Sequence, residues 1–287
     1  MFLANLLIAL REGLEAALVV SIIVAYLVKA DRRDALPKLW GGVALAALIP
    51  LIVGAILTWG PKTLTFQAQE ILGGSLSFVA VGLVTWMIFW MGKNARELKG
   101  EIEGSLSRTL SAGSSGWGVV WIAVIAVGRE GVETALFVWA TVRSSIENST
   151  MQTTLGVLTG LLIAIMMGVL LYQGAVRINF RVFFAVTGYF LVLVAAGIVA
   201  YGVGDFQEAG VLPGIMNHAW DLSAHLPGTT SPLHWLYVLL QAMFQFNLQP
   251  TVLQVVGWIL YIVPVLVLLT IQIQGPRRRP EAKAAAG

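Results

Sequence analysis

The stretch LLIALREGLEAALVVSIIVAYLV, from Leu6 to Val28, places one arginine and two glutamates inside a run of otherwise largely apolar residues. The run is longer than the roughly 20 residues that a helix needs to cross the hydrocarbon core of a bilayer. A charged side chain at that depth costs roughly 2.5–3.5 kcal/mol on insertion scales, so such residues usually face a partner or water and carry a function. The stretch therefore predicts a membrane-spanning helix that contains a buried polar site.

The whole chain has the composition of an integral membrane protein. Of its 287 residues, 57% are hydrophobic and 11% are charged, which is too apolar for a soluble domain of this size. The alternating pattern of an outer-membrane barrel is missing. The first apolar run lacks a basic n-region and a cleavage site, so we expect it to stay in the mature protein. We predict an all-α, multi-pass protein of the inner or plasma membrane.

Seven transmembrane helices are predicted from the apolar windows, with Gly, Pro and charge clusters as their ends. They cover residues 2–28, 38–59, 67–91, 117–141, 152–173, 182–203 and 250–273. The basic residues of the loops gather after the first, third and fifth spans and in the C-terminal tail, whereas the opposite loops hold only Lys62 and Arg143. The positive-inside rule therefore predicts an outer N-terminus and a cytoplasmic C-terminus.

The charged motif occurs twice. The pattern R-E-G-x-E of residues 11–15, in the first span, returns at residues 129–133, in the fourth span. Weaker similarities connect the second and third spans with the fifth and sixth. Because three spans separate the two copies, the copies are expected to run in opposite directions through the membrane. We therefore predict a 3+3 inverted repeat that is followed by one C-terminal helix.

This pattern divides the chain into four predicted segments. Residues 1–110 hold the first three-helix repeat and a cytoplasmic loop, and residues 111–203 hold the second repeat. Residues 204–249 are long for a loop and mix prolines with a half-apolar run, which is typical of an ordered outer cap with a short interfacial helix. Residues 250–287 hold the seventh helix and a basic cytoplasmic tail.

The two motifs are predicted to form one acidic chamber near the middle of the membrane, because residues three apart share a helix face. Two arginines against four carboxylates leave an excess of negative charge that attracts a cation. The glycines of the motifs allow either close helix packing or a local break that frees carbonyl ligands. The predicted metal ligands are Glu12, Glu15, Glu130 and Glu133, and the supporting residues are Arg11, Gly13, Arg129 and Gly131.

An outer vestibule is the second candidate site. Acidic groups that face few basic residues would concentrate cations there. The same side chains could instead be solvated polar residues of the cap, and an acidic residue could complement a helix N-terminus. The methionines of the spans are interpreted as packing residues rather than as soft metal ligands. The predicted members of the vestibule are Glu70, Asp205, Glu208, Asp221, His218 and His225.

Two R-E-G-x-E motifs, in the first and fourth of seven spans, resemble those of the iron permease family. Residues 86–103 and 206–213 are also similar to segments of that family. The resemblance implies that the four motif glutamates bind iron, Fe²⁺ or Fe³⁺, as a substrate and that no permanent cofactor is present. From the inverted repeat we further expect that iron is released to the cytoplasm after a rocking movement of one repeat against the other. Besides membrane lipid, the partner would be an extracellular or periplasmic oxidase or an iron-binding protein.

Other functions stay open from the residues alone. A transporter of manganese or lead, with or without proton coupling, would use the same carboxylates, and the motifs could instead only fix the bundle through ion pairs. A membrane-embedded carboxylate metalloenzyme is disfavoured because all three histidines lie outside the predicted spans. The G-x-G-D of residues 202–205 resembles intramembrane aspartyl proteases but lacks a second aspartate in a span. Nothing indicates a nucleic-acid partner.

Overall fold

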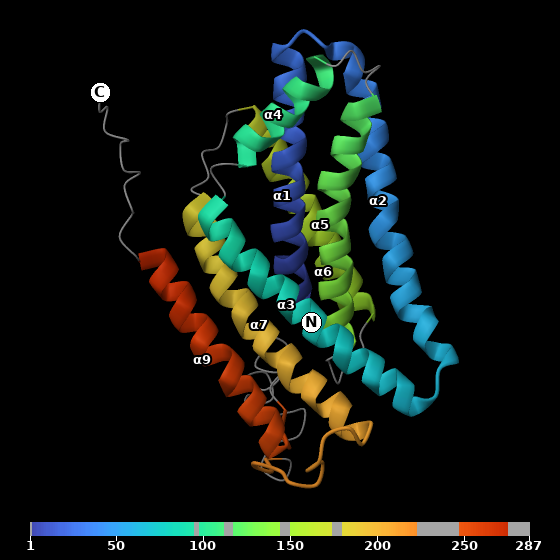
Figure 1. Ribbon diagram of the computed structural model, residues 1–287, viewed down its shortest axis with the longest axis vertical. Helices are drawn as coiled ribbons and strands as arrows, with labels where there is room; N and C mark the ends of the chain where they lie inside the picture. The colour runs from blue at the N-terminus through green and yellow to red at the C-terminus, as the bar shows by residue number, and fades with distance from the viewer. Residues whose placement is uncertain are drawn as a thin grey trace, which may run out of the picture.

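The computed structural model describes residues 2–94, 98–111, 117–143, 150–173, 180–222 and 247–274. Within these ranges most residues are helical, and the only β-type pairing is an isolated bridge between His218 and Thr251. The helices are α1 (Phe2–Lys29), α2 (Leu36–Trp59), α3 (Phe66–Asn94), α4 (Leu98–Ser111), α5 (Trp117–Arg143), α6 (Thr150–Tyr172), α7 (Phe180–Glu208) and α9 (Val252–Gln274), with short 3-10 turns η1 (Arg33–Ala35) and η2 (Gly60–Thr63) (Figure 1).

Five of the described helices, α2, α3, α6, α7 and α9, are long and apolar enough to cross a membrane. The helices α1 and α5 have comparable lengths of 28 and 27 residues, but they carry the charges of the two motifs. Helices are the expected outcome for such apolar runs, because each backbone polar group then finds its partner within the same segment. The prediction of an all-helical chain with several membrane spans is confirmed.

The long helices form two groups (Figure 1). In the first group α1 packs against α6, α2 packs against α5, and α1 and α5 contact each other. In the second group α3 packs against α7, which in turn packs against α9. A buried apolar cluster joins the groups: it includes Ile8 of α1, Phe137 of α5, Val84 of α3, Val192 of α7 and Ile262 of α9. The motif helices therefore lie against a second layer of three helices.

The short helix α4 covers one end of the motif helices. Its Ile102 and Leu106 are buried in a second apolar cluster, together with Leu27 of α1 and Val119 of α5. The helix links the first three long helices to the next three, and its apolar residues, four apart, lie on one helix face. One end of the α1–α5 pair is therefore closed by apolar packing.

Glycines bring the backbones of paired helices into direct contact. A Cβ atom at Gly160 of α6 would collide with the carbonyl oxygen of Leu6 on α1, and one at Gly42 of α2 would lie 2.9 Å from the carbonyl oxygen of Val120 on α5. Small residues at such positions let membrane helices approach closely and gain van der Waals contact. The pairs α1–α6 and α2–α5 are thus the closest-packed parts of the first group.

Replacing Gly160 with Ala should lower stability by about 1–3 kcal/mol, because the added methyl group overpacks the contact with the α1 backbone. The measurement is the melting temperature of the purified protein in detergent. Gly54→Ala in α2 is the matched control, since nothing lies within 4 Å of a Cβ atom there. The control should be neutral or more stable by up to about 1 kcal/mol, from helix propensity. Equal melting temperatures for the two variants would contradict the packing argument.

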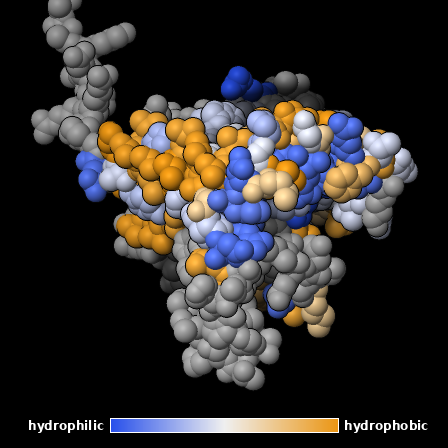
Figure 2. Space-filling model, turned by 90° about the horizontal axis from the view of Figure 1, so that it is seen from below, coloured by the Kyte–Doolittle hydropathy of each residue, from blue (hydrophilic) through white to orange (hydrophobic). Residues whose placement is uncertain are grey.

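The outer faces of the helices are apolar. Exposed large side chains on α2, α6 and α9 include Leu51, Ile56, Leu162, Ile165 and Leu260. Such a continuous apolar surface suits lipid rather than water. Figure 2 shows the end of the molecule that lies at the bottom of Figure 1, where hydrophilic side chains gather near the middle and hydrophobic ones cover much of the left side.

Candidate metal centre

The helices α1 and α5 are antiparallel neighbours. At one end Thr141 donates a hydrogen bond from Oγ1 to Oδ1 of Asn5, at 2.8 Å. At the other end Ile23 and Val119 share one buried cluster. Both helices continue without interruption through their motifs. The two motifs therefore face each other about halfway along the pair.

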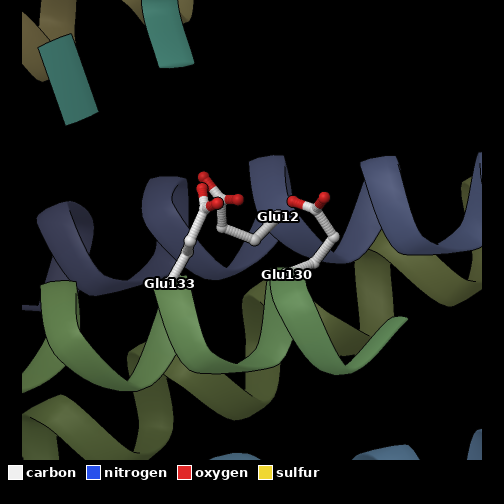
Figure 3. A group of neighbouring side chains, drawn as sticks. All are labelled: Glu12, Glu130 and Glu133. Carbon is white, nitrogen blue, oxygen red and sulfur yellow. The ribbon is translucent and has the colours of Figure 1, made fainter. Parts of the chain in front are cut away.

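Three carboxylates meet where the motifs face each other (Figure 3). One oxygen from each of Glu12, Glu130 and Glu133 lies within 4.8 Å of the others. Glu12 comes from α1 and the other two from α5. The exposed fraction is 1% for Glu12 and 6% for Glu133, and Glu130 is half-buried. We call this group the carboxylate triad.

Each member of the triad has an oxygen, Oε2, that receives no hydrogen bond from the described residues. The Oε1 atoms of Glu12 and Glu133 accept hydrogen bonds at 3.0 Å from Arg11 Nη1 and Arg129 Nε, respectively. A buried carboxylate oxygen without a partner is unfavourable. A cation bound by the three oxygens would remove that penalty. The donor set consists of hard oxygen atoms, which suit iron, manganese, magnesium or calcium.

Glu15 lies outside the triad. It is 5% exposed, and its Oε1 is 3.2 Å from Nη2 of Arg11, four residues earlier on the same helix. The motif spacing predicted four carboxylates in one chamber, and the structure brings three of them together. Since the ion pair with Arg11 holds Glu15 along its own helix, a role for Glu15 as a fourth ligand stays a prediction.

Arg11 is fully enclosed, with 1% of its surface exposed. Besides the two glutamates of its motif, its Nη1 contacts Sδ of Met87 at 3.1 Å. Its guanidinium carbon lies 5.8 Å from the ring centre of Phe184. Sequence reasoning interpreted Met87 as a packing residue and gave Phe184 no role. Neither residue carries a signal in the sequence that would place it beside an arginine.

Arg129, the matching residue of the second motif, has a more open environment. Its side chain is 39% exposed and pairs with Glu133 at 3.0 Å. Its guanidinium carbon lies 5.4 Å from the ring centres of both Trp86 and Trp90 on α3. The two arginines of the repeated motif therefore differ in burial and in partners.

The motif glycines serve helix packing. A Cβ atom at Gly13 would lie 2.8 Å from the Cβ atom of Ala164 on α6, and one at Gly131 would lie 2.9 Å from Pro50 on α2. Because α1 and α5 are unbroken at these positions, the alternative in which a break frees carbonyl ligands finds no support in the geometry.

A comparison of the sequence with family profiles identifies the protein family. The profile described as Iron permease FTR1 family matches residues 2–275. The chain belongs to the iron permease FTR1 family. This result confirms the resemblance carried by the two motifs. Members of this family are transporters, so the protein is a multi-pass membrane permease and not an enzyme.

Relatives of this permease include proteins named ferrous iron permease EfeU. Those of Escherichia coli O6:H1 and Escherichia coli O157:H7 are each 36% identical over 263 residues, which cover 91% of this chain and 92% of theirs. The protein of the same name from Yersinia pestis is 34% identical over 263 residues, with 91% of both chains covered. No solved structure matches the chain.

An ion-pair network joins three helices at the end of the permease opposite α4. Arg143 is the last residue of α5. Its Nη2 lies 3.1 Å from Oε2 of Glu70 on α3, and its Nε lies 3.4 Å from Oδ2 of Asp205 on α7. It also donates a hydrogen bond to the carbonyl oxygen of Gln69 at 3.2 Å. A side chain at Gly73 would collide with the guanidinium group, so this glycine leaves room for it. The apolar windows of the sequence predict a loop position for Arg143, and no local pattern indicates this network.

The remaining predicted vestibule residues that the structure describes lie at the surface. Glu208, His218 and Asp221 are exposed, and Nδ1 of His218 lies 3.2 Å from the carbonyl oxygen of Gln249. His225 lies outside the described residues. The helix α7 continues to Glu208, past the predicted end at residue 203, so two of the predicted loop acids belong to a helix end. The vestibule as a cation-collecting surface stays a prediction.

Proposed function

We propose that this permease imports iron ions and that the carboxylate triad is the place where iron binds during transport. The observation that carries the proposal is the buried group of Glu12, Glu130 and Glu133, whose ligand oxygens lie within 4.8 Å of one another on two helices of a membrane bundle. The relatives named ferrous iron permease support iron as the substrate. Fe²⁺ and Fe³⁺ are both suited to oxygen ligands.

Charge supports uptake in the inward direction. The two motifs together carry two arginines and four glutamates, so with all six ionised they hold an excess of negative charge that a cation balances. An ion that moves into a cell with a negative interior gains about 2.3 kcal/mol per charge per 100 mV. Iron would exchange its bound waters for the carboxylate oxygens of the triad, and Glu15 would serve as a further ligand once Arg11 releases it.

Seven spans in a 3+3 inverted repeat, with an outer N-terminus, form the proposed topology. The packing is consistent with a repeat: α1 lies on α6 as α2 lies on α5, and the motif glycines Gly13 and Gly131 each face the centre of that partner helix, at Ala164 and Pro50. The antiparallel course of α1 and α5 also supports it. In this orientation the Arg143 network faces outwards and α4 faces the cytoplasm.

The packing favours a particular division between moving parts. If one repeat rocked against the other, the close contacts of α1 with α6 and of α2 with α5 would have to separate, because each pair takes one helix from each repeat. A movement of α1, α2, α5 and α6 as one body against α3, α7 and α9 would keep those contacts. Among the described residues, the side-chain contacts of the three arginines and those of the shared apolar cluster would then change.

Another divalent cation, such as manganese or lead, is the alternative substrate, with or without proton coupling, because the same hard oxygens bind it. A partner oxidase or iron-binding protein on the outer side stays a prediction from the family resemblance. The proposed site would be the same for manganese or lead as for iron, and a partner protein would not change it. The two substrate hypotheses differ in which metal ion inhibits the uptake of the other.

Uptake into proteoliposomes tests the proposal. Vesicles that contain the purified permease and hold an inside-negative potential should accumulate radiolabelled iron faster than empty vesicles at the same potential, because the permease lets the cation follow a driving force of about 2.3 kcal/mol per charge per 100 mV. Fe²⁺ is supplied anaerobically and Fe³⁺ as a soluble chelate, each with and without excess Mn²⁺. No uptake above that of empty vesicles would contradict the proposal. Uptake of Mn²⁺ that iron does not inhibit would replace it with the alternative.

A further inference from the structure

The arginines of the two motifs pair differently with the glutamates of their own motif. Arg11 pairs with both acids of its motif, Glu12 at 3.0 Å and Glu15 at 3.2 Å. Arg129 pairs with Glu133 at 3.0 Å, and within the described residues it forms no ion pair with Glu130. The repeated sequence contains no reason for this difference, because residue types and spacing are the same in both copies. The reason must lie in what surrounds each arginine.

Two tryptophans of α3 provide that reason. Trp86 and Trp90 are four residues apart, and their ring centres are 6.4 Å from each other. The guanidinium carbon of Arg129 lies 5.4 Å from each ring centre. Tryptophan is the aromatic side chain that attracts a cation most strongly. Arg11, by contrast, faces the single ring of Phe184, at 5.8 Å.

We propose that Trp86 and Trp90 are positioning residues for metal binding: they hold Arg129 away from Glu130, so that the carboxylate triad keeps the negative charge and the open oxygen that a divalent cation needs. The inference rests on the proposed function of the triad. Two observations support it directly. The guanidinium group of Arg129 lies over both rings, and the Oε2 atom of Glu130 receives no hydrogen bond from the described residues.

The physical effect is a competition between two cations. A guanidinium group that is free to turn can pair with two neighbouring carboxylates, as Arg11 does. If Arg129 did the same, its charge would lie beside two of the three ligands, and an incoming metal ion would have to displace it. The tryptophan rings give the guanidinium another partner without adding negative charge. They therefore make the second motif the more open half of the metal site.

The inference predicts that Trp86→Leu with Trp90→Leu weakens metal binding about tenfold, the combined scale of two cation–π contacts at a partly exposed arginine. The measurement is anaerobic equilibrium binding of Fe²⁺ to the purified full-length permease in detergent. Trp86→Phe with Trp90→Phe should lose less affinity, because phenylalanine rings keep part of the attraction. The matched control is Trp121→Leu on α5, whose side chain is 61% exposed, and its affinity should equal that of the wild type.

Repeating the tryptophan substitutions in an Arg129→Gln variant tests whether the tryptophans act through Arg129 or only stabilise the fold. In Arg129→Gln no guanidinium remains to be held, so the leucine substitutions should not change Fe²⁺ affinity further. Equal weakening in both backgrounds would overturn the inference, and so would unchanged affinity in the leucine and phenylalanine variants. If the leucine pair does not fold, the phenylalanine pair in the two backgrounds decides in the same way.

These outcomes are distinct from a failure of the proposed function. A wild-type permease that does not bind Fe²⁺, or that binds it equally well after Glu130→Gln, would remove the metal site itself. A wild type that binds Fe²⁺ through Glu130, with no dependence on the tryptophans, would leave the site in place and overturn only the role of Trp86 and Trp90.

Discussion

Glu130→Gln should reduce iron uptake by at least about 100-fold, the upper end of the loss seen when only a supporting residue of a metal site is changed. The amide removes one negative charge and one hard ligand from the triad, while its size and shape stay nearly the same. Because Glu130 is half-buried, loss of its charge should not unfold the protein. The measurement is radiolabelled iron uptake in proteoliposomes with equal amounts of permease.

For the other motif glutamates, the loss of iron uptake should depend on whether the residue belongs to the triad. Glu12→Gln and Glu133→Gln should cause losses similar to that of Glu130→Gln, whereas Glu15→Gln should cause a smaller loss because Glu15 pairs with Arg11. Asp34→Asn, on the surface at η1 with its side chain 64% exposed, is the control and should transport normally. Full uptake by all three triad variants at normal protein levels would show that iron binds elsewhere.

Arg11→Met should destabilise the permease by about 3–5 kcal/mol, the usual result of removing one partner of a buried charge pair. Arg11 is 1% exposed and lies between Glu12 and Glu15, so the variant leaves two carboxylates without their cation in an apolar setting. We expect little folded protein in detergent. Melting temperature and the yield of monodisperse protein in size-exclusion chromatography measure the effect.

Two further variants test the cause of that loss. Arg129→Met should be milder than Arg11→Met, because Arg129 is 39% exposed and pairs with one glutamate, whereas Arg11 is buried and pairs with two. Glu15→Gln added to Arg11→Met should recover a large part of the stability, since one unpaired charge is removed. Equal destabilisation by Arg11→Met and Arg129→Met, or no recovery in the double variant, would contradict the role of burial.

The sequence was sufficient for the class of protein and for the main candidate site. Apolar runs of more than 20 residues leave a chain in lipid no alternative to helices, and charged residues inside two of them indicate a site, because lipid does not tolerate isolated charge. The repeated R-E-G-x-E motif also identified the family. These inferences depend on local composition and spacing, which the order of residues contains directly.

Side-chain partners across helices could not be predicted in the same way. The spacing of the motifs was compatible with four equivalent glutamates, yet Glu15 pairs with Arg11 while Glu12 joins the two acids of α5. Arg143 was placed in a loop, although it holds Glu70 and Asp205 on two other helices. The contacts of the triad and of Arg143 join residues far apart in the chain, and no local pattern determines which helix faces which.

The sequence by itself determined that this protein lies in a membrane as a bundle of helices, that two of those helices carry buried acids, and that the chain is an iron permease by family. Only the tertiary structure decided which three acids meet, which arginine is enclosed and which one lies against Trp86 and Trp90. The physical reason is the range of the interactions. The free energy of transfer into lipid depends on the composition of each segment separately, whereas ion pairs and ring contacts act over a few ångströms and depend on how the helices pack.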